Sequence, residues 1–179
     1  MNKNKMKEKL LSGKPAFGVS VMIPSPQVVE MIGRLGFDWV LLDCEHGTLA
    51  LESLELMIMA AEASGITPIV RPEAKDPNVI LRVMDRGALG VQVPHVNTAA
   101  DARHVVQSVK FHPLGNRGLA AGTRPSNYGF GPFCPNLWDT PDRQMPLKCG
   151  QRLITPSPLL LLRARRQERQ GVLRQSHTT

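Results

Sequence analysis

Residues 43–47 read Asp-Cys-Glu-His-Gly and bring two carboxylates, a thiol and an imidazole into one short segment. This segment directly follows the apolar run Trp39–Leu42. A histidine can act as a general base near neutral pH, and neighbouring carboxylates can bind the water molecules around a metal ion. The same residues also fit a strand followed by a solvated polar loop. Residue types alone support the two interpretations about equally, and the context must decide between them.

Four short apolar runs alternate with segments of helical periodicity over the first two-thirds of the chain. Two of the expected helices begin with a capping residue and a proline, at Ser25-Pro26 and Asp76-Pro77. A helix is also predicted over Leu51–Ser64, and Asn97 is predicted to cap a fourth. Glycines are expected to end three of these helices. The predicted strands are Phe17–Met22, Trp39–Leu42, Thr67–Arg71 and Gly90–Val93, and the glycines that end helices are Gly36, Gly65 and Gly87.

This alternation predicts an α/β fold with a parallel sheet and helices outside it. The candidate architectures are an open doubly wound sheet and part of a (βα)₈ barrel. Residues 21–26, Val-Met-Ile-Pro-Ser-Pro, follow the first strand and lack the glycine-rich turn that binds a dinucleotide. The sequence therefore favours parallel (βα) units of a TIM-barrel type, with about the first half of the barrel recognisable. In such barrels the chemistry lies just past the carboxyl ends of the strands, where segment 43–47 stands.

The positive charge of the chain is concentrated near its end. Residues 1–133 hold 14 Lys and Arg against 12 Asp and Glu, whereas residues 134–179 hold 8 against 3. With only 4% aromatic residues, the chain lacks the stacking partners expected of a nucleic-acid-binding protein. It shows no signal peptide and no transmembrane run. Three cysteines without metal-finger spacing favour a reducing, cytoplasmic location.

The character of the sequence changes after Phe111. Residues 112–132 form a long stretch rich in glycine, proline and asparagine, and such loops are often functional. Arg117 and Arg124 lie in it and are candidates for contacts with an acidic substrate or a subunit interface. Residues 134–179 contain five prolines and an arginine-rich run, so we expect an irregular or disordered tail. The predicted division is a (βα) part over residues 1–133 and this tail.

Several motifs in a fixed order make residues 8–133 resemble the HpcH/HpaI family of class II pyruvate aldolases. The resemblance implies a (βα)₈ barrel that commonly assembles as a homo-oligomer. It also implies a metal-dependent lyase that cleaves 4-hydroxy-2-oxo acids into pyruvate, or a related oxo acid, and an aldehyde. The motifs are Gly36-Phe37-Asp38-Trp39, Asp43-Cys44-Glu45-His46-Gly47, Val70-Arg71-Pro72, Asp85-Arg86-Gly87-Ala88, Val93-Pro94 and His112-Pro113-Leu114-Gly115-Asn116-Arg117-Gly118.

The resemblance also implies roles for individual residues. His46 corresponds to the catalytic base, Arg71 to the residue that stabilises the pyruvate enolate, and Asp85 to an acid that raises the basicity of the histidine. Asp43 and Glu45 correspond to groups near the waters of the metal. These types suit the chemistry, because retro-aldol cleavage removes a hydroxyl proton and sends electrons into an enolate that a guanidinium can stabilise.

Asp85 and His95 are the two candidate residues whose positions relative to the site are not fixed by the motifs. Asp85 is predicted at the end of a helix, which normally lies at the face of the barrel opposite the site. It therefore acts on His46 of a neighbouring subunit, belongs to a helix that ends earlier, or is simply a surface carboxylate. His95 follows the fourth strand and is expected near the substrate, while His104 and His112 are expected at the surface.

The metal ligands of the family are not recognisable in this chain. The family places a Glu at the end of the fifth strand and an Asp near the sixth, but no such strand is predicted after Phe133. Mg²⁺ or Mn²⁺ is the cofactor that the resemblance implies, and because its principal ligands are not recognisable here, weak binding and impaired catalysis are predicted. The abrupt change of composition indicates a reading-frame shift or a replaced C-terminus. A non-catalytic scaffold and a citrate-lyase-like or malyl-CoA-type lyase are the alternative functions.

Overall fold

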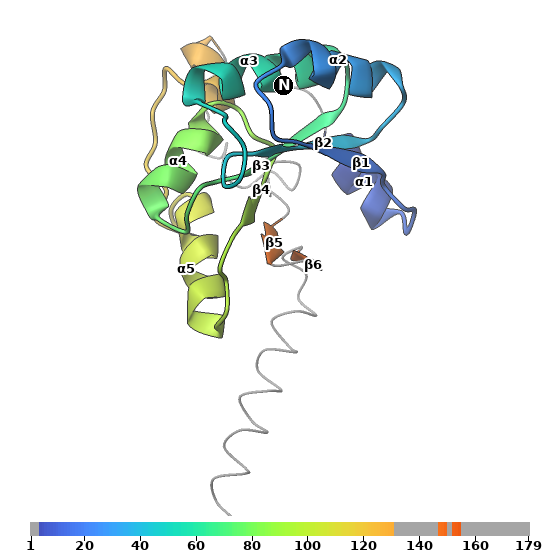
Figure 1. The fold of residues 1–179 in the computed structure, drawn as a ribbon. Helices are drawn as coiled ribbons and strands as arrows, with labels where there is room; N and C mark the ends of the chain where they lie inside the picture. The colour runs from blue at the N-terminus through green and yellow to red at the C-terminus, as the bar shows by residue number, and fades with distance from the viewer. Residues whose placement is uncertain (1–3, 131–146, 150–151, 155–179) are drawn as a thin grey trace, which may run out of the picture.

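The computed structural model describes residues 4–130, 147–149 and 152–154. In these residues six strands form one sheet in the order β1-β2-β3-β4-β5-β6, with helices on both of its faces (Figure 1). The elements are α1 (Lys5–Leu11), β1 (Gly18–Val21), α2 (Pro26–Arg34), β2 (Trp39–Asp43), α3 (Leu51–Ala63), β3 (Thr67–Arg71), α4 (Pro77–Asp85), β4 (Gly90–Val93), α5 (Ala99–Val109), the 3₁₀ helix η1 (Arg124–Gly129), β5 (Leu147–Cys149) and β6 (Arg152–Ile154).

Strands β1 to β4 are parallel, which confirms the predicted (βα) architecture. Val21 pairs with Leu42, which pairs with Val70, which in turn pairs with Val91. Each strand is separated from the next by one helix, so the described part corresponds to consecutive (βα) units of a partial barrel. The carboxyl ends of β2, β3 and β4 therefore meet at one edge of the sheet.

The local signals for the helices are confirmed with one correction. The side chains of Ser25 and Asp76 cap α2 and α4 as predicted, and each of these helices begins with the expected proline. Helix α5 is capped by Thr98, not by Asn97. Thr98 accepts a hydrogen bond from the backbone N–H of Asp101, whose carboxylate accepts one from the backbone N–H of Thr98. This reciprocal capping box moves the start of the helix one residue along. The glycines predicted to end helices, Gly36, Gly65 and Gly87, all have positive φ.

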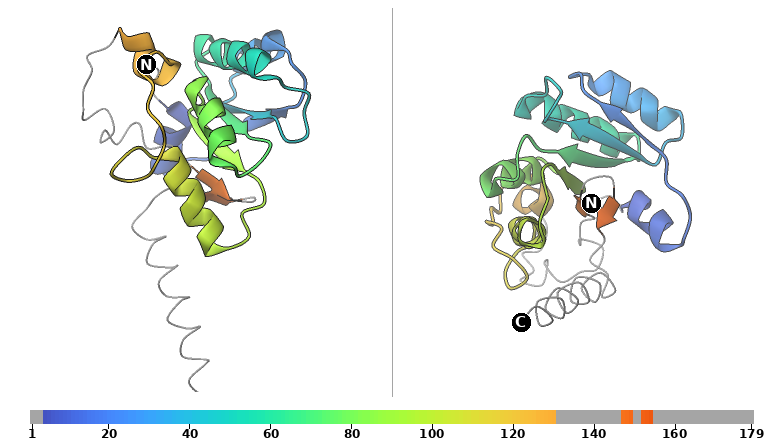
Figure 2. Two further views of the ribbon diagram at one scale, coloured as in Figure 1. Left: turned by 90° about the vertical axis from the view of Figure 1, so that its left-hand side faces the viewer. Right: turned by 60° about the horizontal axis from the view of Figure 1, so that its bottom comes forward.

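Helices α2 to α5 lie together along one face of the sheet, where the main core is buried (Figures 1 and 2). Alternate strand residues, such as Val40, Leu42 and Val70, point into this core. Leu41 and Ile69 point to the other face and pack against Met6 of α1.

Helix α1 itself was not predicted, because its seven residues are mostly charged and only a short apolar stripe faces the sheet. It is fixed by Asn4, whose side chain accepts from the N–H of Lys7 and donates to the carbonyl of Leu89 at 3.2 Å. Helix α1 therefore covers the face of the sheet that carries Leu41 and Ile69, near the amino ends of the strands.

Two short strands correct the expectation that strands end before residue 134. Strand β5 pairs parallel with β4, and β6 runs back antiparallel to β5. Strands of three residues are too short to show periodicity, and this explains the error. The rest of the predicted tail lies outside the described residues. None of the helices in the described ranges has the length and apolar composition that crossing a bilayer requires.

Candidate active site

Asp43 and Arg71 stand side by side at the carboxyl ends of β2 and β3, where the register pairs them directly. Nε of Arg71 donates to Oδ1 of Asp43 at 2.8 Å, and Nη2 donates to Oδ2. The Asp43 side chain is 0% exposed. Burial alone would raise the pKa of Asp43, but the hydrogen bonds from Arg71 and from the backbone N–H of His46 outweigh it and lower the pKa. The same bond to Asp43 raises the pKa of Arg71, so the pair is fully ionised.

Asp43 also shapes the loop that follows it. Its Oδ1 accepts hydrogen bonds from the backbone N–H groups of Glu45, at 3.0 Å, and His46, at 3.2 Å. The loop then passes so close to the sheet that a Cβ at Gly47 would lie 2.2 Å from the carbonyl oxygen of Asp43 and 2.6 Å from that of Met22. Glycine is required there. Together these two constraints hold His46 at the edge of the sheet.

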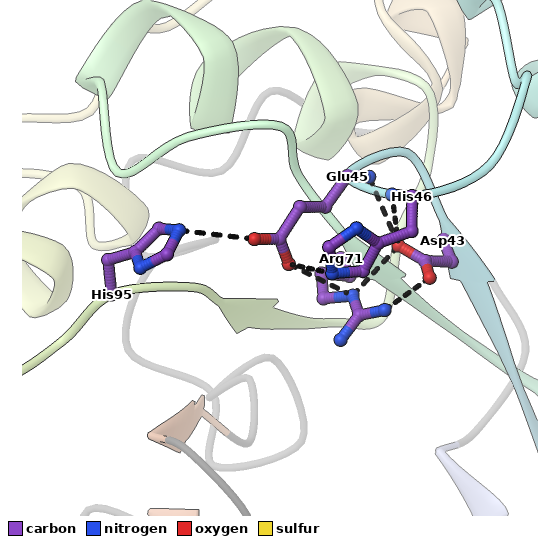
Figure 3. A network of polar contacts seen from close by, with 5 residues as sticks. All are labelled: Asp43, Glu45, His46, Arg71 and His95. Atoms are coloured by element: carbon purple, nitrogen blue, oxygen red, sulfur yellow. Dashed lines mark hydrogen bonds and ion pairs between the residues drawn. The ribbon is translucent and has the colours of Figure 1, made fainter.

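Glu45 links the cationic groups of the site (Figure 3). Its Oε2 lies 3.3 Å from Nε of Arg71 and 3.6 Å from Nε2 of His46, and its Oε1 lies 3.2 Å from Nε2 of His95. The histidine side chains are 60% and 75% exposed, whereas Glu45 is 14% exposed. A largely buried carboxylate therefore orients two imidazoles that remain open to solvent.

His95 reaches Glu45 from an unusual backbone conformation. Its φ is +55°, in the left-handed region that few residues other than glycine adopt. Such conformations cost free energy and concentrate at functional sites. The sequence placed His95 after a strand, but it contained no signal for this turn or for the contact with Glu45.

The guanidinium of Arg71 keeps one nitrogen free for a ligand. Nε and Nη2 are used by Asp43, and within the described residues Nη1 makes no hydrogen bond (Figure 3). Because Asp43 holds the guanidinium plane in a fixed orientation, Nη1 can donate to an anionic oxygen without reorganisation. His46, linked to Arg71 through Glu45, supplies a solvent-accessible base beside it. This arrangement can remove a proton from a small anionic ligand and stabilise the negative charge that develops.

Asp85 lies elsewhere, as the last residue of α4 before β4 and hence at the amino ends of the strands. Nη2 of Arg117 donates to its Oδ1 at 2.7 Å, and the Arg117 side chain is 2% exposed over the ring of Phe111. Burial lowers the pKa of Arg117, and the bond to Asp85 only partly offsets this. The structure therefore does not bring Asp85 to His46 of the same chain.

The two loop arginines, candidates for contacts with a substrate or a subunit interface, pair with carboxylates inside the chain. Arg117 binds Asp85, and Arg124 binds Glu62 of α3. Both guanidinium groups connect the glycine-rich loop to the helices. His104 and His112 are exposed, as expected.

The described residues do not fit a divalent metal ion. Among them, no group of three or more His, Cys, Asp or Glu residues has the placement to hold one. Both oxygens of Asp43 are bound by Arg71, and the oxygens of Glu45 face Arg71 and two imidazoles. Cys44 offers neither a ligand nor a nucleophile, because burial, with added repulsion from Glu73 and Asp43, raises the pKa of its thiol to about 12.

Known proteins resemble this chain in sequence and in fold. A family model described as HpcH/HpaI aldolase/citrate lyase matches residues 17–154, and so extends past the predicted boundary at residue 133. The 2-dehydro-3,6-dideoxy-6-sulfogluconate aldolase of Pseudomonas putida is 41% identical over 112 residues, which are 63% of this chain and 44% of that protein. The chain spans about half the length of the curated relatives it matches.

Two solved structures resemble the described fold. One is an HpcH/HpaI aldolase/citrate lyase family protein from Burkholderia cenocepacia, with a TM-score of 0.73, 26% identity, and coverage of 82% of this chain and 58% of that one. The other is the citrate synthase SbnG, with a TM-score of 0.63, 38% identity, and coverage of 65% and 48%. Both agree with the partial barrel that the strand register shows.

Proposed function

The chain belongs to the HpcH/HpaI aldolase/citrate lyase family, and from this premise we propose that it is a carbon–carbon lyase acting on a 4-hydroxy-2-oxo acid. The products are pyruvate, or a related oxo acid, and an aldehyde. The observation that carries the proposal is the convergence of His46 and Arg71 on one oxygen of Glu45 at the carboxyl edge of the sheet. Barrels of this type have their active sites at this edge.

In the proposed reaction His46 removes the proton from the C4 hydroxyl of the substrate. The C3–C4 bond then breaks, the aldehyde leaves, and the electron pair passes into the oxo acid as an enolate. Nη1 of Arg71 donates to the enolate oxygen, while Asp43 holds the guanidinium in place. The proton on His46 then returns to C3 and completes the oxo acid. Glu45 orients the imidazole of His46 through its Oε2 and contacts His95 through its Oε1, so that both histidines lie beside the substrate.

Asp85 has a role in this scheme only between chains. Within one chain it lies at the amino ends of the strands and is bound by Arg117. We propose that it supports His46 of a neighbouring subunit in a homo-oligomer, where it would raise the basicity of the imidazole. Within the described residues only its Oδ1 is hydrogen-bonded, which leaves Oδ2 for that contact.

The metal-dependence of related aldolases is a separate part of the proposal. The donor set of the described residues does not fit Mg²⁺ or Mn²⁺, so no step above is assigned to a metal. Weak divalent-metal binding stays a prediction, and calorimetric titration with both ions tests it. Tight stoichiometric binding would contradict it and would show that ligands outside the described residues, or in a second chain, complete a site.

The setting of the reaction is proposed from the sequence. We place the enzyme in the cytoplasm, with a small oxo acid as its partner and with neither nucleic acid nor membrane as a target. We also keep the division into a (βα) part and a different C-terminal tail as a proposal, with the short strands β5 and β6 attached to the sheet of the first part.

Citrate-type chemistry is the second candidate, favoured by the 38% identity to the citrate synthase SbnG. Both reactions pass through an enolate beside a cationic group, so the cluster fits either. Incubation with citrate, with oxaloacetate and an acetyl donor, and with a 4-hydroxy-2-oxo acid separates the two. Turnover of the last substrate alone supports the aldolase.

Pyruvate release from a 4-hydroxy-2-oxo acid tests the proposal. His46→Ala should lower the rate about 10²–10⁴-fold, the usual contribution of a general base. His104→Ala is the matched control, because His104 is an exposed histidine on α5, away from the cluster. An unchanged rate in His46→Ala, or equal losses in both variants, would exclude His46 as the base.

A further inference from the structure

Gln92 is a polar residue in the middle of β4, between two valines of the main core. Val91 and Val93 are buried and point toward the helices. Because strand residues alternate between faces, Gln92 points to the opposite face, which carries Leu41, Ile69 and the site. Its side chain is partly exposed there.

The strand register places Gln92 beside the arginine of the site. Val70 pairs with Val91, so the next residues, Arg71 and Gln92, lie at the same level on neighbouring strands. Asp43 pairs with Arg71 on the other side. Neighbouring strands are about 4.8 Å apart. The row Asp43, Arg71 and Gln92 therefore continues across the sheet, and a ligand of a few atoms bound to Arg71 reaches Gln92.

The amide of Gln92 is available to such a ligand. Within the described residues it makes no side-chain hydrogen bond, and the level below it on this face is apolar, with Leu41 and Ile69. Because the Gln92 side chain is partly exposed, a ligand can reach its amide. Arg71 is committed to Asp43 and Glu45 through two of its nitrogens, and its Nη1 and the Gln92 amide make no hydrogen bond within the described residues. The register continues the row to Lys148 of β5, on the far side of Gln92 from Arg71.

We propose that Gln92 binds a hydroxyl group adjacent to the oxo-acid oxygens held by Arg71, so that the site selects hydroxylated over unsubstituted 2-oxo acids. An amide both donates and accepts, and this matches a hydroxyl, which also does both. Arg71, a pure donor, takes the anionic oxygens. The inference rests on the proposed oxo-acid function and adds to it a specificity residue and the chemical class that this residue selects.

Binding of pyruvate and hydroxypyruvate, which differ by one hydroxyl, tests the inference without requiring turnover. Calorimetric or NMR titration of the full chain should give tighter binding of hydroxypyruvate. Gln92→Met keeps a flexible side chain of similar size and should weaken hydroxypyruvate binding roughly tenfold, the effect of one lost hydrogen bond. Pyruvate binding should stay unchanged. Gln107→Met, at an exposed position on α5, is the matched control and should change neither.

The outcomes separate the inference from the function on which it rests. If the wild type binds both acids and Gln92→Met leaves their affinity ratio unchanged, Gln92 does not select the hydroxyl and the inference alone fails. Equal weakening of both acids also overturns it. If the wild type binds neither acid, the proposed function fails and takes the inference with it. Gln92→Leu, with thermal unfolding recorded for each variant, checks that the result does not depend on one substitution.

Discussion

Within the described residues, an Asp–Arg ion pair lies near each end of the sheet, and the two pairs differ in what surrounds them. At the carboxyl end Arg71 binds Asp43 with two nitrogens, keeps Nη1 free and stands beside exposed histidines. At the amino end Arg117 binds Asp85, stacks on Phe111 and is almost entirely enclosed. The same chemical pair thus presents a cation to solvent in one place and ties a loop to the fold in the other.

The difference shows that solvent accessibility, rather than residue type, distinguishes a ligand-binding ion pair from a structural one. Both arginines fall in motifs that resemble an aldolase family, and residue type alone does not separate them. Accessibility separates them, because a ligand can reach the free edge of Arg71 but not the covered guanidinium of Arg117. Removing one partner of an enclosed ion pair is strongly destabilising, because the other charge is left buried and unpaired.

Removing the enclosed arginine should have the largest effect. Arg117→Met leaves Asp85 without its partner and frees the loop, so the free energy of unfolding should fall by about 3–5 kcal/mol. Urea unfolding measures this change. Arg82→Met, at an exposed position on α4, is the control. A loss below about 0.5 kcal/mol, the usual range for surface substitutions, would show that the amino-end pair is not structural.

Replacing the accessible arginine should affect activity instead. Arg71→Lys keeps the charge but loses the two-nitrogen contact with Asp43 and the oriented Nη1, so pyruvate release should fall about 10²–10³-fold. The melting temperature should change little compared with Arg117→Met. Arg34→Lys, on an exposed part of α2, should keep full activity. Full activity of Arg71→Lys would show that the bidentate Arg71–Asp43 pair is not needed to stabilise the enolate.

Acid should weaken the carboxyl-end pair in a way that depends on Asp43. The folded-state pKa of Asp43 is lowered, so its contribution to stability is complete above the ordinary aspartate pKa and is lost as the pH falls through the folded value. Asp43→Asn removes this titration, so the loss of unfolding free energy between pH 7 and pH 3, measured by urea unfolding, should become smaller by up to about 1 kcal/mol. Identical pH dependence in both proteins would contradict the ionised pair.

The smallest expected effect concerns Cys44, which lies in the site motif but is buried. Because its pKa is raised to about 12, it stays a thiol at pH 8 and should react with iodoacetamide at least about tenfold more slowly than in urea. Peptide mass spectrometry measures the labelling of Cys44. Its burial also predicts that stability falls as the pH rises from about 9 toward 12, since the folded state retains a proton that the unfolded state loses. Rapid labelling of the native protein would show that the loop opens.

The fold of residues 18–109 follows closely from local sequence signals, because caps, glycine stops and apolar alternation act over a few residues. Ser25, Asp76 and the four parallel strands are where those signals predict them. Helix α1 and strands β5 and β6 were missed, since each is held by contacts with distant strands and carries little periodicity of its own.

The candidate site could be predicted only in part. The placement of His46 and Arg71 follows from their position after neighbouring parallel strands. The bridging contacts of Glu45, the positive φ of His95 and the alignment of Gln92 with Arg71 depend on register and loop path. Asp85 lies where the helical pattern predicts it, at the end of a helix and at the opposite edge of the sheet, although its motif resembles a site motif of the family.

Exchange of the pyruvate methyl protons in D₂O, followed by NMR, tests the central claim most directly, because it requires only a base and a stabilised enolate. The wild-type chain should exchange these protons faster than buffer alone. His46→Ala and Arg71→Lys should lose most of the excess rate, while His104→Ala should keep it. Exchange at the buffer rate in the wild type, or exchange that survives loss of His46, would contradict an enolate-forming site at the carboxyl edge of the sheet.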